Sequence, residues 1–324
     1  MTAYAWTAAD LEADTGWIYD LPPAVLAELE ATLPALRAKP LEDLTPVDCV
    51  LPAFAPMAAQ IKAQLEQGRG LALIRRLPVQ RWSEEDIARA YWVLGAQIGI
   101  GVSQSYKGDR LGHVRDIGEG GRYYTVGGAL EMHMDPVDVV GLLCVKRAVA
   151  GGGSRITAST SVRDAIAADY PDMIPLLERG FHYTSRREDR QAGAPPVTPH
   201  RVPVFGQIEG RPASFYLPIA VRNTESEGVT LTAQEKDALA LVNTVAQRPE
   251  LCFEMDLQPG EIQFLNNRLI FHGRADYEDA QALAEKRHML RLWLMMPDWP
   301  QRPPDQDMHA HHDRAGGGIA AASG

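Results

Sequence analysis

Apolar positions in the first hundred residues recur with the spacing of amphipathic helices. Pro22 and Pro23 open the run AVLAELEATLPAL, and proline is favoured in a first helical turn because the N–H it lacks has no partner there. Ser83 precedes EEDIARAYWVLGAQIG, where a serine cap and acidic residues near the helix N-terminus are both stabilising. A short apolar run at 70–75 predicts a buried strand between these helices. We therefore expect an N-terminal helical flank over residues 1–65.

After about residue 100 the chain changes to short apolar runs separated by glycine. Strands are predicted over 138–145, 261–267 and 288–296, because each is a short apolar stretch bounded by turn-forming residues. Helical insertions are predicted over 161–178 and 232–246. Helices first, followed by many short strands with helical insertions, are typical of an α+β protein built on a β-sandwich or barrel.

The helical insertions carry their own boundary signals. Pro171 and Pro175 should divide the first insertion, because proline removes a helix hydrogen bond and clashes with the preceding turn. Thr232 and Glu235 have the spacing of a capping box, which opens the second insertion. The three glycines at 151–153 predict a sharp bend after the strand that precedes them.

Two segments are predicted to lie outside the regular elements. Residues 186–203 are polar and proline-rich, and we interpret them either as a lid over a pocket or as a disordered insertion. After Pro300 the composition changes, which predicts a flexible tail over 301–324, outside a single domain spanning 1–300. The histidines of this tail resemble an adventitious metal-binding tract, and they are His309, His311 and His312.

Composition narrows the class of protein. The 324 residues are 45% hydrophobic and 23% charged, as in ordinary globular proteins. The formal net charge of −10 argues against nucleic-acid binding, which needs a dominant basic surface. Cys49, Cys144 and Cys252 form no C-x-x-C pair, which excludes a cysteine zinc finger and indicates a reducing compartment. No signal peptide and no apolar run long enough to span a membrane are visible, so we expect a cytoplasmic protein.

The first candidate for chemistry is the H-x-D pattern of His133 and Asp135. Residues two apart in a strand point to the same face, so both side chains can reach one metal ion. The pattern alone is weak, because about one H-x-[DE] is expected by chance in a chain with this many acidic residues. A second occurrence, His311 to Asp313, is interpreted as accidental. A structural hydrogen bond or a zinc site is the alternative at His133 and Asp135.

A second histidine and a charged strand strengthen this candidate. His272 ends another apolar stretch, and a third ligand of this kind would complete a facial triad for non-heme Fe(II). Arg287, Arg291 and Trp293 share parity, so in an extended strand they face the same side. An arginine side chain that points into the core destabilises the fold unless it pairs with an anion. Its planar guanidinium can form two parallel hydrogen bonds to a carboxylate. A metal site beside a carboxylate clamp is what a chelating 2-oxo acid requires.

These motifs resemble, in order and spacing, those of the TauD/TfdA family of Fe(II)- and 2-oxoglutarate-dependent dioxygenases, within the clavaminate synthase-like superfamily. The resemblance covers residues 65–297 and runs from the H-x-D through the 151–154 bend and N-N-x-x-x-x-H-x-R to R-x-x-x-R-x-W-L. It implies a double-stranded β-helix, or jelly roll, behind the helical flank. By this resemblance the iron ligands are His133, Asp135 and His272.

The resemblance also assigns the cosubstrate and the substrate. Arg291 resembles the arginine that pairs with the distal carboxylate of 2-oxoglutarate, Ser154 the hydroxyl that helps to hold it, and Arg287 a second arginine near the oxo-acid end. The duller alternatives are a buried acid beside Arg291, a turn role for Ser154 and a structural ion pair for Arg287. Segments that line the substrate pocket in relatives contain three residues here, which are Gln104, Tyr124 and Thr125.

The implied activity needs Fe(II), 2-oxoglutarate and O2, and releases succinate and CO2. It implies hydroxylation of a C–H bond in a small polar substrate, an amino acid or a related carboxylate. Desaturation, epoxidation or another oxidative rearrangement is the rival outcome, whereas halogenation is disfavoured because Asp135 is present. A non-catalytic jelly-roll sensor of a metal or ligand is the rival class. Relatives form dimers and tetramers, and the sequence leaves a homo-oligomer open.

Overall fold

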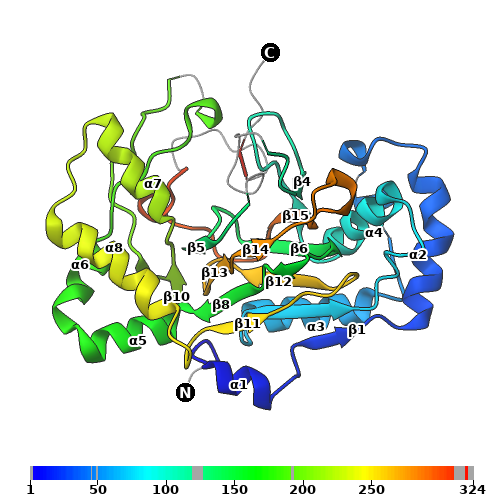
Figure 1. Ribbon diagram of the computed structural model, residues 1–324, viewed down its shortest axis with the longest axis horizontal. Coiled ribbons are helices and arrows are strands. Elements are labelled where there is room, and N and C mark those ends of the chain that lie inside the picture. The colour runs from blue at the N-terminus through cyan, green and yellow to red at the C-terminus, as the bar shows by residue number, and fades with distance from the viewer. Residues whose placement is uncertain are drawn as a thin grey trace.

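Two β-sheets pack face to face, and helices cover the outer face of each (Figure 1). The computed structural model describes residues 3–44, 46–48, 50–118, 127–190, 193–309 and 318–319. The larger sheet contains, in order, β1 (Ile18–Asp20), β2 (Leu71–Arg75), β12 (Ile262–Asn266), β6 (Val139–Lys146), β15 (His288–Met295) and β3 (Ile100–Gly101), and β4 (Leu111–Val114) also pairs with β15. The smaller sheet contains β11 (Phe253–Met255), β8 (Ser154–Ala158), β13 (Ile270–Arg274) and β5 (Leu130–His133).

The helices form two groups on opposite sides of the sheets. On the right of Figure 1, the larger sheet is covered by α2 (Pro23–Leu36), α3 (Ala55–Glu66) and α4 (Glu84–Ala96). On the left, the smaller sheet is covered by α5 (Ser159–Asp169), α6 (Ile174–Arg179), α7 (Pro218–Arg222) and α8 (Ala233–Ala246). The remaining elements are α1 (Ala8–Ala13) and two ribbons, β9 (Phe205–Ile208) with β10 (Arg211–Ser214) and β7 (Ala150–Gly151) with β14 (Tyr277–Glu278).

Strand alternation divides the apolar side chains among three cores. Along β2, Leu71 and Leu73 enter the core between the sheets, whereas Ala72 and Ile74 pack against the helices of the larger sheet. In the smaller sheet, Phe271 points outward into the helical core on the other side. Truncating a buried phenylalanine of this kind to alanine costs about 3–5 kcal/mol. The space between the sheets is therefore where inward-facing polar residues can gather.

The predicted elements are largely confirmed. Ser83 caps α4, and Thr232 with Glu235 forms the capping box of α8. The first helical insertion is divided at Pro171, between α5 and α6. Pro175 differs from the prediction, because it lies in the first turn of α6 and breaks nothing there. The α+β class and the double-stranded arrangement of the sheets agree with the expected jelly roll.

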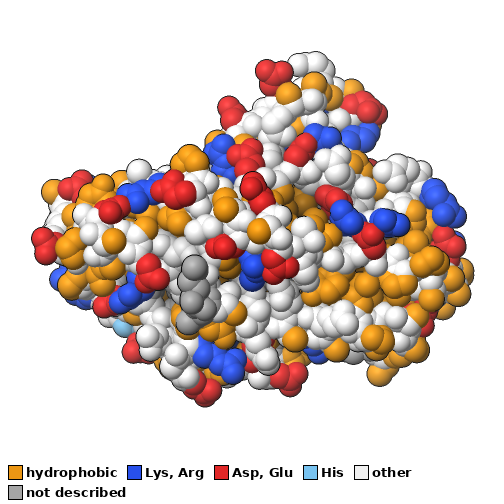
Figure 2. Space-filling view, turned by 90° about the horizontal axis from the view of Figure 1, so that it is seen from below, with side chains coloured by type: hydrophobic (Ala, Val, Ile, Leu, Met, Phe, Trp, Pro, Cys, Tyr) orange, Lys and Arg blue, Asp and Glu red, His pale blue; other side chains and the backbone are white. Residues whose placement is uncertain are grey.

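Charged side chains of both signs are interspersed on the face of the molecule seen from below (Figure 2). The described residues on that face show both signs side by side, and hydrophobic side chains gather on its right-hand side. Among the described residues, no helix combines the length and the apolar character needed to cross a membrane.

Candidate metal centre and cavity

His133 and His272 face each other across neighbouring strands of the smaller sheet. His133 is the last residue of β5, and the strand register pairs it directly with His272 in β13. Met132 and Phe271 point toward the outer helices, so alternation turns both histidines toward the space between the sheets. Their ring centroids lie 4.3 Å apart, and both side chains are buried. Two imidazoles that are distant in sequence therefore meet at one point of the fold.

Asp135 completes the group, although it lies beyond the strand and not within it as the H-x-D pattern predicted. The backbone after β5 is held by the N–H of Met134, which donates to the carbonyl of Tyr216, and by Asn267, whose Oδ1 accepts from the N–H of Asp135 at 3.3 Å. The three side chains offer ligand atoms that all lie within 4.8 Å of one another. The meeting of the three side chains therefore depends on these two hydrogen bonds to residues far away in the sequence, and strand parity alone does not account for it.

The protonation of this triad suits a divalent cation. His133 Nδ1 lies 2.9 Å from the carbonyl oxygen of Glu131, so a proton on Nδ1 leaves the lone pair of Nε2 for a metal. Burial, together with His133, lowers the pKa of His272 to about 3, which keeps its ring neutral. Burial alone would raise the pKa of Asp135, but the charge of Arg291 and the hydrogen bond from Trp293 hold it below its usual value. One carboxylate and two neutral imidazoles form the donor set of a non-heme Fe(II) site, so the residues present fit that ion.

Arg291 and Trp293 of β15 both reach the carboxylate of Asp135. Trp293 Nε1 donates to Oδ2 at 3.0 Å, and Arg291 Nη1 lies 3.2 Å from the same oxygen. The guanidinium also lies over the Trp293 ring, 5.0 Å from its centroid. Because Leu292 between them points into the helical core, both residues face the space between the sheets as their parity predicted. Arg291 therefore lies beside the metal site and contacts one of its ligands.

Gln104 was expected to contact substrate, and the structure gives it another task. Its side chain is fully buried and does not line the cavity described below. Oε1 accepts from Arg291 Nε at 2.7 Å, and Nε2 donates to the carbonyl oxygens of Arg291 and Arg110. Both ends of the amide thus hold the arginine in place. The sequence contained no signal for this pairing, because Gln104 lies in the segment between β3 and β4 and is 187 residues from Arg291.

Arg287 lies beside a register shift between β6 and β15. His288 pairs with Lys146 and Met289 with Cys144, so the extra residue at this shift is in β6. Arg287 itself directly precedes β15, which begins at His288. Its guanidinium is buried and lies 5.5 Å from the ring centroid of Tyr277. Burial, with Arg274 nearby, lowers the pKa of Arg287 to about 10. Among the described residues, no carboxylate lies within ion-pair distance of this guanidinium.

The predicted glycine bend borders this buried arginine. Gly152 has a φ of +77°, and a Cβ added there would lie 3.3 Å from Arg287 Nε. Ser154 follows at the start of β8, is buried and donates from Oγ to Gln263 Oε1 at 3.0 Å. Neither Ser154 nor Arg287 lines the main cavity. Tyr124 and Thr125, the other two expected substrate residues, lie outside the described residues.

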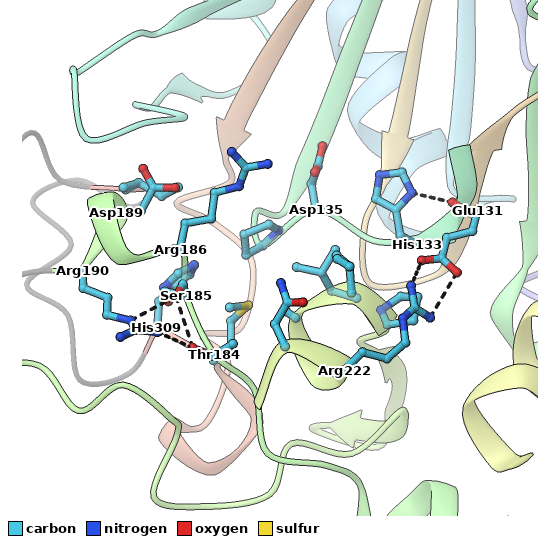
Figure 3. A pocket seen from close by; sticks show the side chains of 18 of the residues that line it. Glu131, His133, Asp135, Thr184, Ser185, Arg186, Asp189, Arg190, Arg222 and His309 are labelled. Atoms are coloured by element: carbon cyan, nitrogen blue, oxygen red, sulfur yellow. Dashed lines mark hydrogen bonds and ion pairs between the residues drawn. The ribbon is translucent and has the colours of Figure 1, made fainter. Parts of the chain in front are cut away.

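A cavity of about 610 Å³ opens beside the triad (Figure 3). His133, Asp135, Arg291 and Trp293 form its inner end. Its outer part is lined by residues 184–190, by α7 and by residues near the C-terminus. Two ion pairs lie in this wall, Arg222 with Glu131 and Arg190 with Glu227. The first part of the predicted lid, residues 186–190, therefore borders the cavity, and Asp189 within it accepts from the backbone N–H of Tyr106.

The segment after Pro300 differs from the expected flexible tail. Over 301–309 the chain packs against the domain, and Met308 and His309 are 5% and 4% exposed. Met308 belongs to the apolar core under the left-hand helices. The prediction of a tail outside the core is therefore wrong for this stretch, while His311 and His312 lie outside the described residues.

Comparisons with known proteins agree with this geometry. The model of the taurine catabolism dioxygenase TauD, TfdA family matches residues 38–293. FR-33289 synthase of Streptomyces rubellomurinus is 28% identical over 316 residues, covering 94% of this chain and 92% of the relative. Taurine hydroxylase-like protein SAT17 of Stachybotrys chartarum is 24% identical over 342 residues, covering 95% of this chain and 84% of the relative.

Solved structures show the same fold. An asparagine oxygenase in complex with Fe(II), 2S,3S-3-hydroxyasparagine and succinate superposes with a TM-score of 0.66 at 15% identity, covering 95% of this chain and all of the other. The non-heme iron oxygenase OrfP in complex with Fe and α-ketoglutaric acid superposes with a TM-score of 0.63 at 13% identity, covering 95% and 100%. The expected fold is thus confirmed.

Proposed function

The chain belongs to the taurine catabolism dioxygenase TauD, TfdA family and is a dioxygenase that uses Fe(II) and 2-oxoglutarate, and from this premise we propose that it hydroxylates a C–H bond of an amino acid or a related small carboxylate. The observation that carries the proposal is the buried convergence of His133, Asp135 and His272 at the inner end of the cavity. A metal held there would be within reach of a molecule in the cavity, because His133 and Asp135 line it, and all three side chains that would hold the metal are buried.

When bound, Fe(II) and 2-oxoglutarate supply O2 activation, with release of succinate and CO2, and insertion of oxygen into a C–H bond. The protein's own residues set the geometry for this chemistry. Trp293 and the backbone of Glu131 orient the carboxylate and one imidazole of the triad, as outer hydrogen bonds to metal ligands commonly do. Asn267 fixes the backbone that carries Asp135. Burial of all three ligands limits access of bulk water.

The contacts favour Arg287 over Arg291 as the clamp for the distal carboxylate of the cosubstrate. Arg291 Nη1 lies 3.2 Å from a ligand oxygen of Asp135, too close to the metal for a group at the far end of a five-carbon chelator. Arg287 is buried, without a carboxylate partner among the described residues, and the neighbouring Ser154 is buried as well. A buried guanidinium is stable only when an anion meets it. We therefore assign Arg287 and Ser154 to the cosubstrate and Arg291 to the inner end of the substrate cavity.

The charges of the cavity support a zwitterionic substrate such as an amino acid. Its wall carries as many guanidinium groups as carboxylates, which are Arg186, Arg190, Arg222 and Arg291 with Glu131, Asp135, Asp189 and Glu227. A molecule with one ammonium and one carboxylate can exchange partners with such pairs without leaving a buried charge unpaired. The superposed asparagine oxygenase is in complex with 2S,3S-3-hydroxyasparagine, and a further structure of OrfP is in complex with (3S)-hydroxy-L-Arg.

The test is succinate release from the iron-loaded enzyme with each L-amino acid in turn, followed by mass spectrometry of the product. Hydroxylation predicts that one amino acid stimulates succinate release and gains one oxygen atom. A product that has lost two hydrogens instead identifies desaturation at the same site. If no amino acid or amino-acid derivative stimulates release above the substrate-free rate, the proposed substrate class is wrong.

We further propose a cytoplasmic location and no partner beyond small molecules and a second copy of the chain. The support is chemical: the described cysteines, Cys144 and Cys252, are free thiols, and unpaired thiols persist in reducing compartments. Size-exclusion chromatography with light scattering measures the oligomeric state directly.

A further inference from the structure

The C-terminal segment, defined as residues 301–309, is attached to the domain by hydrogen bonds to a region about 90 to 110 residues earlier in the chain. Arg302 Nη2 donates to the carbonyl of Ser214 at 2.8 Å, and Gln306 Nε2 donates to the carbonyl of Gln207 at 3.1 Å. His200 Nε2 lies 3.2 Å from the carbonyl of Asp307. These hydrogen bonds all join the segment to residues 200–214, so its path over the domain is fixed.

The segment ends in the cavity that contains the triad. Met308 and His309 line this cavity together with His133, Asp135 and Trp293. Figure 3 shows His309 beside Ser185 and Thr184, and its Nδ1 lies 3.4 Å from Ser185 Oγ. Both residues are buried, and Met308 also packs into the apolar core.

The family match ends before this segment begins. The model of the family covers residues 38–293, which include the triad, Arg287, Arg291 and Trp293. The segment is thus a part of the cavity wall that lies beyond the residues matched by the family model. A wall of this kind is suited to distinguish substrates, because binding residues on connecting segments vary while the scaffold that holds the metal is kept.

We propose that the C-terminal segment is the specificity wall of the substrate site, and that Met308 and His309 contact the substrate there. His309 supplies a hydrogen-bonding imidazole at the polar side of the cavity, near Ser185. Met308 supplies an adaptable apolar surface, which fills irregular space against a carbon skeleton. The substrate it selects carries a polar group at the end remote from the reacting carbon, and an apolar stretch between. This inference rests on the proposed function, because it takes the cavity to be the place where substrate binds.

A substrate-free experiment tests the placement of this wall. Iron-loaded full-length protein is treated with ascorbate and hydrogen peroxide, and oxidised residues are located by mass spectrometry, with zinc-loaded protein as the blank. Radicals formed at the bound iron reach only nearby side chains, so Met308 and His309 should be oxidised at least fivefold more with iron than with zinc. Met57 of α3, on the far side of the larger sheet, should be oxidised equally in both. Equal oxidation of Met308 and His309 with the two metals would overturn the proposal.

A second experiment tests selection. For the amino acid that gives the highest succinate rate, His309→Ala and His309→Gln should raise the substrate KM about 10-fold, since one hydrogen bond to a polar group contributes about 1.5 kcal/mol. The KM for 2-oxoglutarate should stay within twofold. Asp305→Ala, an exposed change in the same segment, should leave both constants unchanged. Unchanged substrate KM in both His309 variants would overturn the proposal. If no amino acid is a substrate, the proposed substrate class is wrong. The oxidation pattern then still tests whether Met308 and His309 lie beside the metal site.

Discussion

The inner and outer halves of the cavity are built in different ways. The inner half lies on strands: His133 ends β5, His272 lies in β13, and Arg291 and Trp293 lie in β15. The outer half lies on connecting segments, which are residues 184–190, α7 and the C-terminal segment. The inner residues are held by register pairs and buried hydrogen bonds, whereas the outer wall contains ion pairs partly open to solvent.

This difference separates chemistry from selection. Strands hold the two histidines, and hydrogen bonds hold Asp135 just beyond β5, within the narrow limits that metal chemistry requires. Segments outside the sheets can change sequence without disturbing those limits, and the family match covers all of the inner half but not the C-terminal segment. Variants of the inner half should therefore lose metal, cosubstrate and turnover together, and variants of the outer half should lose only substrate recognition.

Removal of a triad ligand should have the largest effect. His272→Ala should lower the iron affinity by more than the about 100-fold that loss of an outer hydrogen-bond partner causes, and succinate release should become undetectable. Metal content after dialysis against a weak chelator measures this. Asp313→Ala is the matched control, because it removes the acid of the second H-x-D in the chain. Equal iron loss in both variants would contradict the assignment of the triad.

The second largest effect should be a difference between Arg287 and Arg291 in their contribution to 2-oxoglutarate binding. Arg287→Gln should raise the KM for 2-oxoglutarate by about 10- to 100-fold, since a charge-assisted hydrogen bond contributes about 1.5–3 kcal/mol. Arg291→Gln should raise it less and should mainly lower coupling between succinate release and product formation. Lys286→Gln, a change of the adjacent cation that pairs with Asp116, is the control. A larger effect on the cosubstrate KM from Arg291→Gln than from Arg287→Gln would restore the role first expected for Arg291.

A smaller effect is expected from the indole beside the carboxylate. Trp293→Phe keeps most of the packing but removes the N–H that donates to Asp135 Oδ2, and should weaken iron binding about 10-fold. Trp299→Phe makes the same change in the helical core and should leave iron binding unaltered. Competition with a colorimetric chelator measures both affinities, and indistinguishable values would show that the indole does not support the ligand.

The smallest effect concerns the pH dependence of stability at the start of β15. Burial, with Arg115 and His113 nearby, lowers the pKa of His288 from 6.5 to about 4, while Glu84 opposes the shift. Between these values the unfolded chain binds more protons than the folded one at this position, so the stability that His288 contributes falls as the pH drops from 6.5 toward 4. Urea unfolding at several pH values should show a shallower decline for His288→Gln than for the wild type. An equal decline in the two proteins would exclude His288 as a source of it.

The sequence predicted the inner half well because its signals are local. An H-x-D, a later histidine in an apolar run and an arginine with strand parity depend on neighbours along the chain, and the structure brings His133, Asp135 and His272 together. The pairing of Gln104 with Arg291 was not predictable, because it joins a connecting segment to a strand 187 residues away. Arg287 was expected in the same strand as Arg291, but β15 begins one residue after it, a boundary that the sequence does not mark. The C-terminal segment was predicted to be flexible because its composition is polar and rich in proline, and that composition gives no sign that Met308 and His309 are buried.

The most direct test of the iron and cosubstrate site is an anaerobic absorption titration of the metal-free protein with Fe(II) and then with 2-oxoglutarate. A charge-transfer band should appear only when Fe(II) and 2-oxoglutarate are both bound. Succinate, which lacks the 2-oxo group and cannot form the same chelate, should produce no band, and neither should His272→Ala with 2-oxoglutarate. Absence of the band in folded, iron-loaded wild-type protein, or an identical band in His272→Ala, would contradict the account.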